Sequence, residues 1–378
     1  MGKPIYLDYN ATTPIDPDVV NEMIPFIQSY FGNPSSSYSI GQENKETISK
    51  ARKQVATLIN ARPEEITFTS GGTESNNHAI RGSAIAYQEK GKHIITSSIE
   101  HPAVTNVCRH LAKQGWEITW LPVDKTGKVN PTDVESAIRP DTVLITIMHS
   151  NNEIGTLQPI KEISEIAKRN HILLHSDAAQ SVGKVDTDVK ALGVDFLSIA
   201  GHKLYAPKGI GALYIKQGVD IENLMYGAGQ EEGVRPGTEN VAHIVALGKA
   251  CEIATDNLDN NYRNMFDTRE KLLEGLFLNL KKIKVNTNID NSLPNTLSIA
   301  FDKIEAHSLT ALIGNEVLIS TGSACHSGIT EISSVLKAMN MDLLTAASTV
   351  RISTGKYTTA EEIDFAVEAI SNAVLKLS

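Results

Sequence analysis

A lysine and an aspartate near the middle of the chain stand where they could act on the same small molecule. Lys203 comes shortly after the apolar residues 196–197, and Asp177 closes another apolar run at 172–174. Alone, such a lysine is usually a solvated charge and such an aspartate a helix cap or a surface turn. Together they offer an amine for a Schiff base and a carboxylate that keeps a pyridine nitrogen protonated. Pyridoxal phosphate (PLP) needs both groups to act as an electron sink.

Other polar side chains follow apolar runs that come earlier in the chain. Residues 94–95 lead to His101, and residues 143–147 lead to Asn152. Ligands of open α/β sheets bind beyond the carboxyl ends of the strands, so these side chains could converge on one cleft with the lysine and the aspartate. His101 could be a buried core histidine. It could also stack on a ring and shuttle protons, because its pKa lies near neutrality.

Two further features could bind anionic groups. Residues 70–74, Ser-Gly-Gly-Thr-Glu, follow a strand-like run and open a helix, where Gly72 and Thr73 could meet an anion at the positive helix end. The plainer interpretation is a glycine-rich connection with an N-cap. Arg351 follows apolar residues and precedes a turn. Its guanidinium could bind a carboxylate through two hydrogen bonds, or it could form a surface ion pair.

The three cysteines differ in their surroundings. They are far apart and odd in number, so neither a metal site nor a disulfide framework is expected. Cys108 and Cys251 lie in helix-like apolar segments and should be buried and inert. Cys325 lies beside a histidine in the small, polar stretch 320–328, which predicts a mobile loop. A thiol in such a loop is a candidate nucleophile.

The elements that must position these residues alternate between strands and helices. Short β-rich runs occur between residues 60 and 215, and helix-like stretches at 73–88, 102–113 and 160–169 separate several of them. The runs are apolar without strict alternation, which suits strands covered on both faces. The pattern predicts an α/β domain with a mainly parallel sheet. The runs lie at 66–68, 94–96, 118–121, 143–147, 172–174, 196–199 and 212–215.

The pattern changes at both ends of this region. Asp16-Pro17 predicts a helix start, with a cap followed by proline at the first helical position. After about residue 240, an amphipathic helix is expected at 261–282, followed by short strands and a C-terminal helix from Ala360. These features predict a smaller α+β domain.

Composition narrows the class of protein. The chain has 378 residues, of which 41% are hydrophobic and 21% charged, as in an ordinary globular protein. Its net charge of −9 argues against a general nucleic-acid binder. No apolar signal core begins the sequence, and no stretch approaches the ~18 apolar residues of a membrane span. A cytoplasmic protein without a membrane segment is therefore expected.

Taken together, these motifs closely resemble the cysteine desulfurases of the NifS-like class, within PLP fold type I, the aspartate-aminotransferase-like fold. The match runs almost end to end and is specific in its order. The matched segments are YLDYNATTP (6–14), GNPSS (32–36), SGGTESNN (70–77), EH (100–101), NNEIG (151–155), DAAQ (177–180), GHK (201–203), RPGT (235–238) and GSAC (322–325).

The resemblance implies how PLP would be held. Lys203 would form the Schiff base with PLP and move protons, and Asp177 would pair with the pyridinium nitrogen. Gln180 would contact the ring hydroxyl, and His101 would stack on the ring. Gly72 and Asn152 would also contact PLP. Its phosphate would be bound by Thr73, by His202 and by Thr238 of the partner subunit.

The resemblance also implies the reaction. Asn152 and Arg351 would hold the carboxylate of L-cysteine, and Cys325 would attack its sulfur, keeping it as a persulfide while L-alanine leaves. A sulfur-acceptor protein and a homodimer are implied, without a membrane or direct contact with nucleic acid. The implied domains are a large PLP-binding domain, 13–255, and a small domain formed by 1–12 and 256–378 that carries the nucleophile loop.

Three departures leave details open. Relatives often have serine at Ala200, histidine at Tyr38 and proline at Ile332. Selenocysteine lyase remains a second interpretation with the same site. A catalytically idle scaffold is a third, although the intact Lys203, Asp177 and Cys325 argue against it. The sulfur acceptor also stays open among an iron–sulfur scaffold, a tRNA-thiolating enzyme and a DNA-sulfur-modifying partner.

Overall fold

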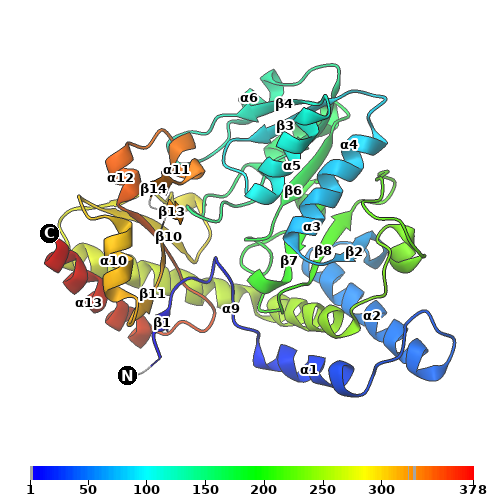
Figure 1. The fold of residues 1–378 in the computed structure, drawn as a ribbon, viewed down its shortest axis with the longest axis horizontal. Coiled ribbons are helices and arrows are strands. Elements are labelled where there is room, and N and C mark those ends of the chain that lie inside the picture. Colours follow the sequence, from blue (N-terminus) through cyan, green and yellow to red (C-terminus); the bar gives the residue numbers. More distant parts are fainter. Residues whose placement is uncertain (1–2, 322, 327–328) are drawn as a thin grey trace.

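The computed structural model describes residues 3–321, 323–326 and 329–378, and gives only the backbone for 323–326 and 329–331. Two sheets of different size stand side by side, joined by a long helix (Figure 1). Among the described residues, no helix is both long and apolar enough to cross a membrane.

The larger sheet confirms the expected α/β class. Its seven strands follow the order β2-β8-β7-β6-β5-β3-β4, and those from β7 to β4 run parallel. Only β8 pairs antiparallel with its neighbours on both sides. The strands are β2 (Ile66–Thr69), β3 (His93–Ser97), β4 (Glu117–Leu121), β5 (Thr142–Thr146), β6 (Leu173–Asp177), β7 (Phe196–Ala200) and β8 (Gly211–Ile215).

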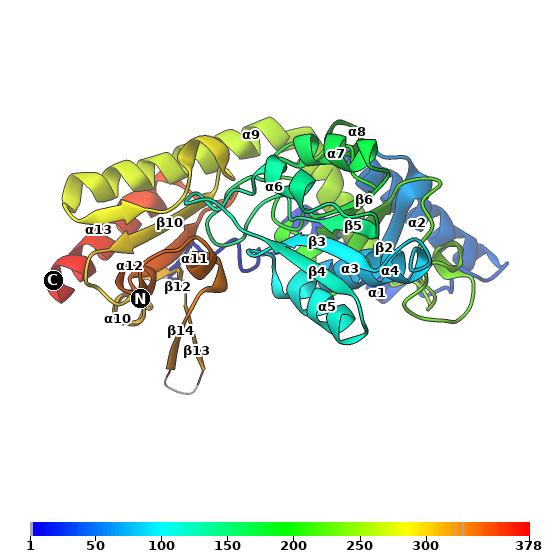
Figure 2. The same ribbon diagram turned by 90° about the horizontal axis from the view of Figure 1, so that it is seen from above.

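Helices cover both faces of this sheet (Figure 2). Successive strand residues point to opposite faces: Ile94 and Leu144 pack with α5, whereas Ile95 and Ile145 pack with α7. Asp16 caps α1 as expected, with its carboxylate accepting from the N–H of Asp18. The helices are α1 (Pro17–Gln28), α2 (Ser39–Leu58), α3 (Gly72–Asn77), a π-helical turn (His78–Gly82), α4 (Ser83–Ala86), α5 (Pro102–Lys113), α6 (Pro131–Ser136), α7 (Ile160–Arg169) and α8 (Val189–Leu192).

The smaller unit is built on an antiparallel sheet in the order β12-β15-β10-β9. The helix expected at 261–282 is the second half of the longer α9, and the C-terminal helix begins at Ala360 as expected. A two-stranded parallel sheet pairs β1 with β11. The elements are β1 (Ile5–Tyr6), α9 (Val241–Asn279), β9 (Ile283–Val285), β10 (Thr296–Phe301), α10 (Ala306–Ile313), β11 (Val317–Leu318), β12 (Ser320–Thr321), α11 (Ser334–Ala338), α12 (Leu343–Ala347), β15 (Thr349–Ser353) and α13 (Ala360–Leu377).

Cys325 lies in a strand and not in the expected loop. β13 (Ser323–His326) pairs antiparallel with β14 (Ile329–Ile332), and Cys325 faces Thr330 across the ladder. The β-branched residues of the second strand favour this pairing, which the small residues of the first strand concealed in the sequence. The hairpin projects from the smaller unit (Figure 2).

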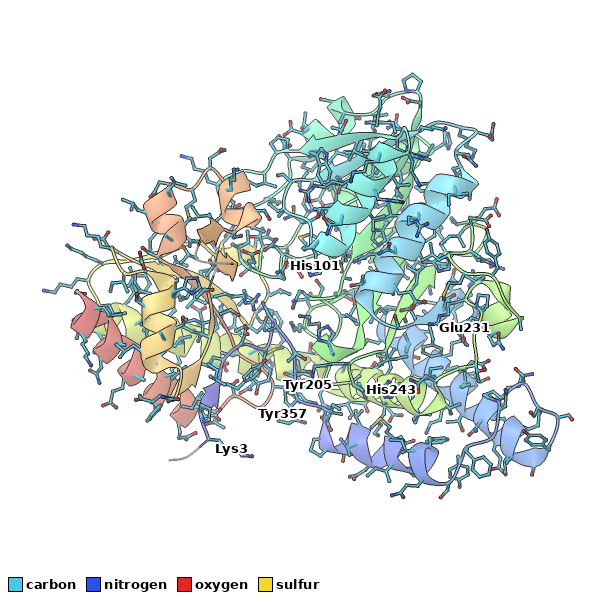
Figure 3. All side chains as sticks on the ribbon, viewed as in Figure 1. Lys3, His101, Tyr205, Glu231, His243 and Tyr357 are labelled. Atoms are coloured by element: carbon cyan, nitrogen blue, oxygen red, sulfur yellow. The ribbon has the colours of Figure 1, made fainter. Side chains whose placement is uncertain are left out.

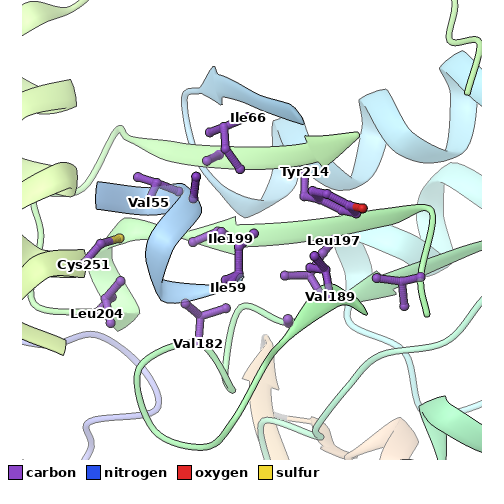
Figure 4. Close-up of a cluster of buried hydrophobic side chains, with 14 of the residues drawn as sticks. Val55, Ile59, Ile66, Val182, Val189, Leu197, Ile199, Leu204, Tyr214 and Cys251 are labelled. Carbon is purple, nitrogen blue, oxygen red and sulfur yellow. The ribbon is translucent and has the colours of Figure 1, made fainter. Parts of the chain in front are cut away.

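Each unit has its own hydrophobic core. One core joins the large sheet to α2, α7 and the first part of α9, and Cys251 is part of it (Figure 4). The other packs the small sheet against α10, α13 and the second part of α9. The predicted boundary at residues 255 and 256 falls inside α9, close to Asn257, whose backbone departs from helical geometry (φ −126°, ψ 15°).

Candidate functional site

A cavity of about 780 Å³ brings most of the candidate residues together. It lies beyond the carboxyl ends of the parallel strands, where an open α/β sheet binds its ligands. Asp177 ends β6, and Lys203 closes a 3₁₀ turn that follows β7. The candidate residues that line it are Gly72, Thr73, His101, Asn152, Asp177, Gln180, His202, Lys203 and Arg351.

Lys203 is poised to act as a neutral amine. Its Nζ donates hydrogen bonds to the backbone carbonyls of Asn10 and Ala11, the latter at 2.7 Å. Burial, followed by the positive charge of Arg351, lowers its pKa to about 8. A larger fraction of the amine is therefore unprotonated near neutral pH than for an ordinary lysine, and the unprotonated amine is the form that attacks an aldehyde.

Asp177 is held as a fixed hydrogen-bond acceptor at the cavity wall. Its Oδ2 accepts from the side chain of Asn76 at 2.6 Å, and its Oδ1 accepts from the N–H of Ala179 at 2.9 Å. The side chain is only 6% exposed. A buried carboxylate held by two donors can keep a facing pyridine nitrogen protonated.

His101 stands at the junction of the two units (Figure 3). Its Nδ1 accepts from the N–H of Ala103 at 3.1 Å and so caps α5. In the neutral ring the proton is therefore on Nε2. Part of the ring faces the open cavity, yet desolvation by the surrounding protein lowers its pKa, while Asp177 acts in the opposite direction. A neutral ring is suited to stacking on a flat cofactor.

The start of α3 lines the cavity and forms a cradle there. Gly71 has φ +144°, a conformation open to glycine, and a Cβ on Gly72 would come within 3.3 Å of the Ala200 side chain. His202 also lines this end, and burial followed by the charges of Lys203 and Lys208 lowers its pKa to about 4. The cradle offers backbone N–H groups and a neutral histidine to an anion.

Arg351 is already oriented by the protein. Its Nη2 lies 2.6 Å from Oδ1 of Asp8 and donates to Ser320 at 3.1 Å, and its Nη1 donates to the carbonyl of Asn152 at 3.0 Å. Its Nε is buried without a partner among the described atoms. Arg351 lines the cavity, so its guanidinium could bind an incoming carboxylate there.

Two of the sequence candidates are not among the residues that line the cavity. Thr238 is exposed and does not line the described cavity of its own chain. Cys325 has a described backbone only, so the position of its thiol lies outside the described residues. As expected, Cys108 is buried, and burial raises its pKa to about 12. Cys251 is buried too, and its pKa is raised for the same reason.

The residues that line this cavity fit PLP. The Lys203 amine, with its lowered pKa, suits the aldehyde of PLP, and the fixed Asp177 carboxylate suits its pyridine nitrogen. The neutral His101 imidazole suits the ring, and the cradle at the start of α3 suits the phosphate. Sequence reasoning missed two supporting residues, Asn10 and Asn76. Both lie within motifs noted above, but only contacts reveal their roles: Asn10 offers its carbonyl to Lys203, and Asn76 donates to Asp177.

Comparison with known proteins identifies the family of this chain. The aminotransferase class-V family model matches residues 5–365. The cysteine desulfurase IscS of Methanosarcina thermophila is 48% identical over all of this chain and 93% of its own length. That of Dictyoglomus turgidum is 46% identical over all of this chain and 96% of its own.

Solved structures with a similar fold belong to the same class of protein. One described as a NifS-like protein superimposes with a TM-score of 0.93 at 38% identity and covers 99% of this chain and all of its own. One described as SspA in complex with cysteine has a TM-score of 0.83 at 37% identity and covers 95% of this chain and all of its own. The chain therefore belongs to the aminotransferase class-V family, PLP enzymes of fold type I, and within it to the cysteine desulfurases.

Proposed function

We propose that this chain is a PLP-dependent cysteine desulfurase, which converts L-cysteine to L-alanine and keeps the sulfur as a persulfide for transfer. The observation that carries the proposal is the meeting of Lys203, Asp177 and Arg351 in one cavity. The solved relative described as bound to cysteine supports the substrate. The comparisons give no support to a selenocysteine lyase or to an idle scaffold.

Each residue has a defined task in this reaction. PLP, when bound through Lys203, supplies an electron sink next to the substrate carbon. Arg351 and Asn152 hold the substrate carboxylate, and Lys203 Nζ takes and returns a proton near that carbon. The Cys325 thiolate attacks the substrate sulfur. The carbon–sulfur bond breaks, its electron pair stays with the carbon, and a proton then completes alanine.

A homodimer completes the site in this proposal. Thr238 is exposed and outside its own cavity, which suits a residue that serves the phosphate of the other subunit. The sulfur then passes to an acceptor protein, and the proposed location is the cytoplasm.

The proposal is tested by incubating the purified protein with L-cysteine and measuring alanine and sulfide in the presence of a reductant. We expect equal amounts of the two products, and neither from Lys203→Ala. The Lys203→Ala variant should also lose the visible absorption of lysine-bound PLP. A wild-type protein that retains PLP but releases no alanine from cysteine would refute the function.

A further inference from the structure

A second lysine lies buried beneath the cavity. Lys184 is only 3% exposed, and its Nζ donates to Oε1 of Gln180 at 3.0 Å and to Oδ1 of Asn10 at 3.3 Å. No carboxylate forms an ion pair with it in the part of the chain that the structure describes. Burying an ammonium group beside neutral acceptors costs stability, so this position needs a functional reason.

The backbone holds Lys184 firmly in this place. It closes the turn after β6, in which its N–H donates to the carbonyl of Ser181 at 2.9 Å. The preceding Gly183 has φ +77°, and a Cβ there would come within 2.0 Å of Leu204. Glycine thus lets the turn pack against the residue that follows Lys203, which brings the two lysines to the same wall of the site.

The contacts of Lys184 lead directly to the reacting groups. Both side-chain contacts of Lys184 are donations from Nζ to oxygen acceptors, so Oε1 of Gln180 faces Lys184, which fixes the orientation of the amide. Nε2 of Gln180 then donates to the Asn10 carbonyl at 2.9 Å and has a second hydrogen on the same nitrogen. The same Asn10 carbonyl accepts from Lys203 Nζ.

Asn10 is also tied to the smaller unit. Its Nδ2 donates to Thr296 of β10 at 2.8 Å, and its Oδ1 accepts from Asn295 at 3.0 Å as well as from Lys184. Lys184 therefore joins a network that spans both units and ends at the catalytic lysine. Loss of its two bonds would free the Gln180 amide to rotate and would loosen Asn10.

We propose that Lys184 is a positioning residue, which orients the Gln180 amide toward the cavity and sets the Asn10 carbonyl against Lys203. This inference rests on the proposed function and adds a residue that the reaction needs but that does not touch substrate. The charged groups around it are compatible with this role. Burial, then Lys203 and Arg351, lower the pKa of Lys184 to about 7, and Lys184 contributes to the lowered pKa of His202.

Three variants of the PLP-loaded protein test the proposal. Lys184→Met keeps the length of the side chain but cannot donate, and Lys184→Gln can still donate to Gln180. Lys161→Met makes the same chemical change at an exposed position on α7 and serves as the control. For each, we would measure the rate of PLP release during dialysis, kcat and KM for cysteine, and the melting temperature.

We expect Lys184→Met to release PLP about tenfold faster and to lose about tenfold in kcat, with KM within about twofold, because the two hydrogen bonds that position Gln180 and Asn10 are lost. Lys184→Gln should recover most of the PLP retention and most of kcat, and the control Lys161→Met should match wild type. PLP release and kcat at wild-type values in Lys184→Met would overturn the proposal. So would a Gln variant as defective as the Met variant, because the donor would then not matter.

If Lys184→Met does not fold, Lys184→Gln decides alone. PLP retention and kcat close to wild type support a positioning donor, whereas rapid PLP loss from folded Lys184→Gln overturns it. The proposed function fails separately, because it predicts that the wild-type protein binds PLP and releases alanine whatever the variants do.

Discussion

Replacing Arg351 by alanine should damage substrate recognition far more than folding. The guanidinium is 12% exposed, lines the cavity and is fixed by Asp8 and Asn152. A carboxylate held by such a group makes two charge-assisted hydrogen bonds, each worth about 1.5–3 kcal/mol. Water entering the cavity recovers part of this, so we expect a net loss of about 2–4 kcal/mol in transition-state binding, or about 30- to 1000-fold in kcat/KM.

The assay is alanine formation at varied cysteine concentration, with PLP content measured in the same preparations. Arg351→Lys should recover only part of the loss, because an ammonium lacks the planar fork that Asp8 and Ser320 orient here. Arg169→Ala is the matched control. Its arginine is 59% exposed and pairs with Glu135 at the surface, where an ion pair contributes little.

The reasoning is refuted if Arg351→Ala keeps kcat/KM within about threefold of wild type while its PLP content is normal. It is also refuted if Arg351→Lys is fully active. Loss of PLP from Arg351→Ala would instead place the guanidinium in the cofactor site.

The remaining predictions concern pH, the hairpin and the partner subunit. Because the pKa of Lys203 is lowered to about 8 and only the neutral amine attacks the aldehyde, the rate of PLP capture by the apoprotein should rise with pH, reach half its maximum near pH 8 and level off roughly one pH unit higher. A rate that keeps rising toward pH 10, where ordinary lysines titrate, would contradict this. Ser333 donates to Glu153 at the base of the β13–β14 hairpin, so Ser333→Ala should slow persulfide formation roughly tenfold with normal PLP absorption. An unchanged single-turnover rate would show that this contact does not position the hairpin. Thr238→Ala should weaken PLP retention and leave the dimer intact, measured by dialysis and size-exclusion chromatography; a monomeric wild-type protein would contradict the shared site.

The sequence was informative where a strand ends in a polar residue. Asp177 and Lys203 could be placed at the carboxyl ends of parallel strands, because each follows a predicted strand and each has a side chain that PLP needs. The helix at 102–113 was predicted with its observed bounds, since proline marks its start. The prediction of a helix at 261–282 missed the part of α9 that begins at Val241 and ran past the helix end at Asn279, because the buried start of α9 lacks the amphipathic pattern of its second half.

Other features depend on contacts that the sequence does not display. In the sequence, Lys184 cannot be told from a solvated lysine. Its burial follows from the packing of Gly183 against Leu204, which the local pattern does not show. The pairing of Asp8 with Arg351 joins residues 343 positions apart. The strand that carries Cys325 is specified by its partner β14 more than by its own small residues. In each case tertiary packing decides the structure and local pattern does not.

The central claim is that Cys325 receives the sulfur of cysteine. The most direct test mixes the PLP-loaded protein with one equivalent of L-cysteine without reductant and locates the added sulfur by mass spectrometry of proteolytic fragments. The account predicts a persulfide on Cys325, alanine in equal amount, and neither persulfide nor sustained turnover in Cys325→Ala that still binds PLP. A substrate-derived persulfide on Cys108 or Cys251, or full turnover by Cys325→Ala, would contradict it.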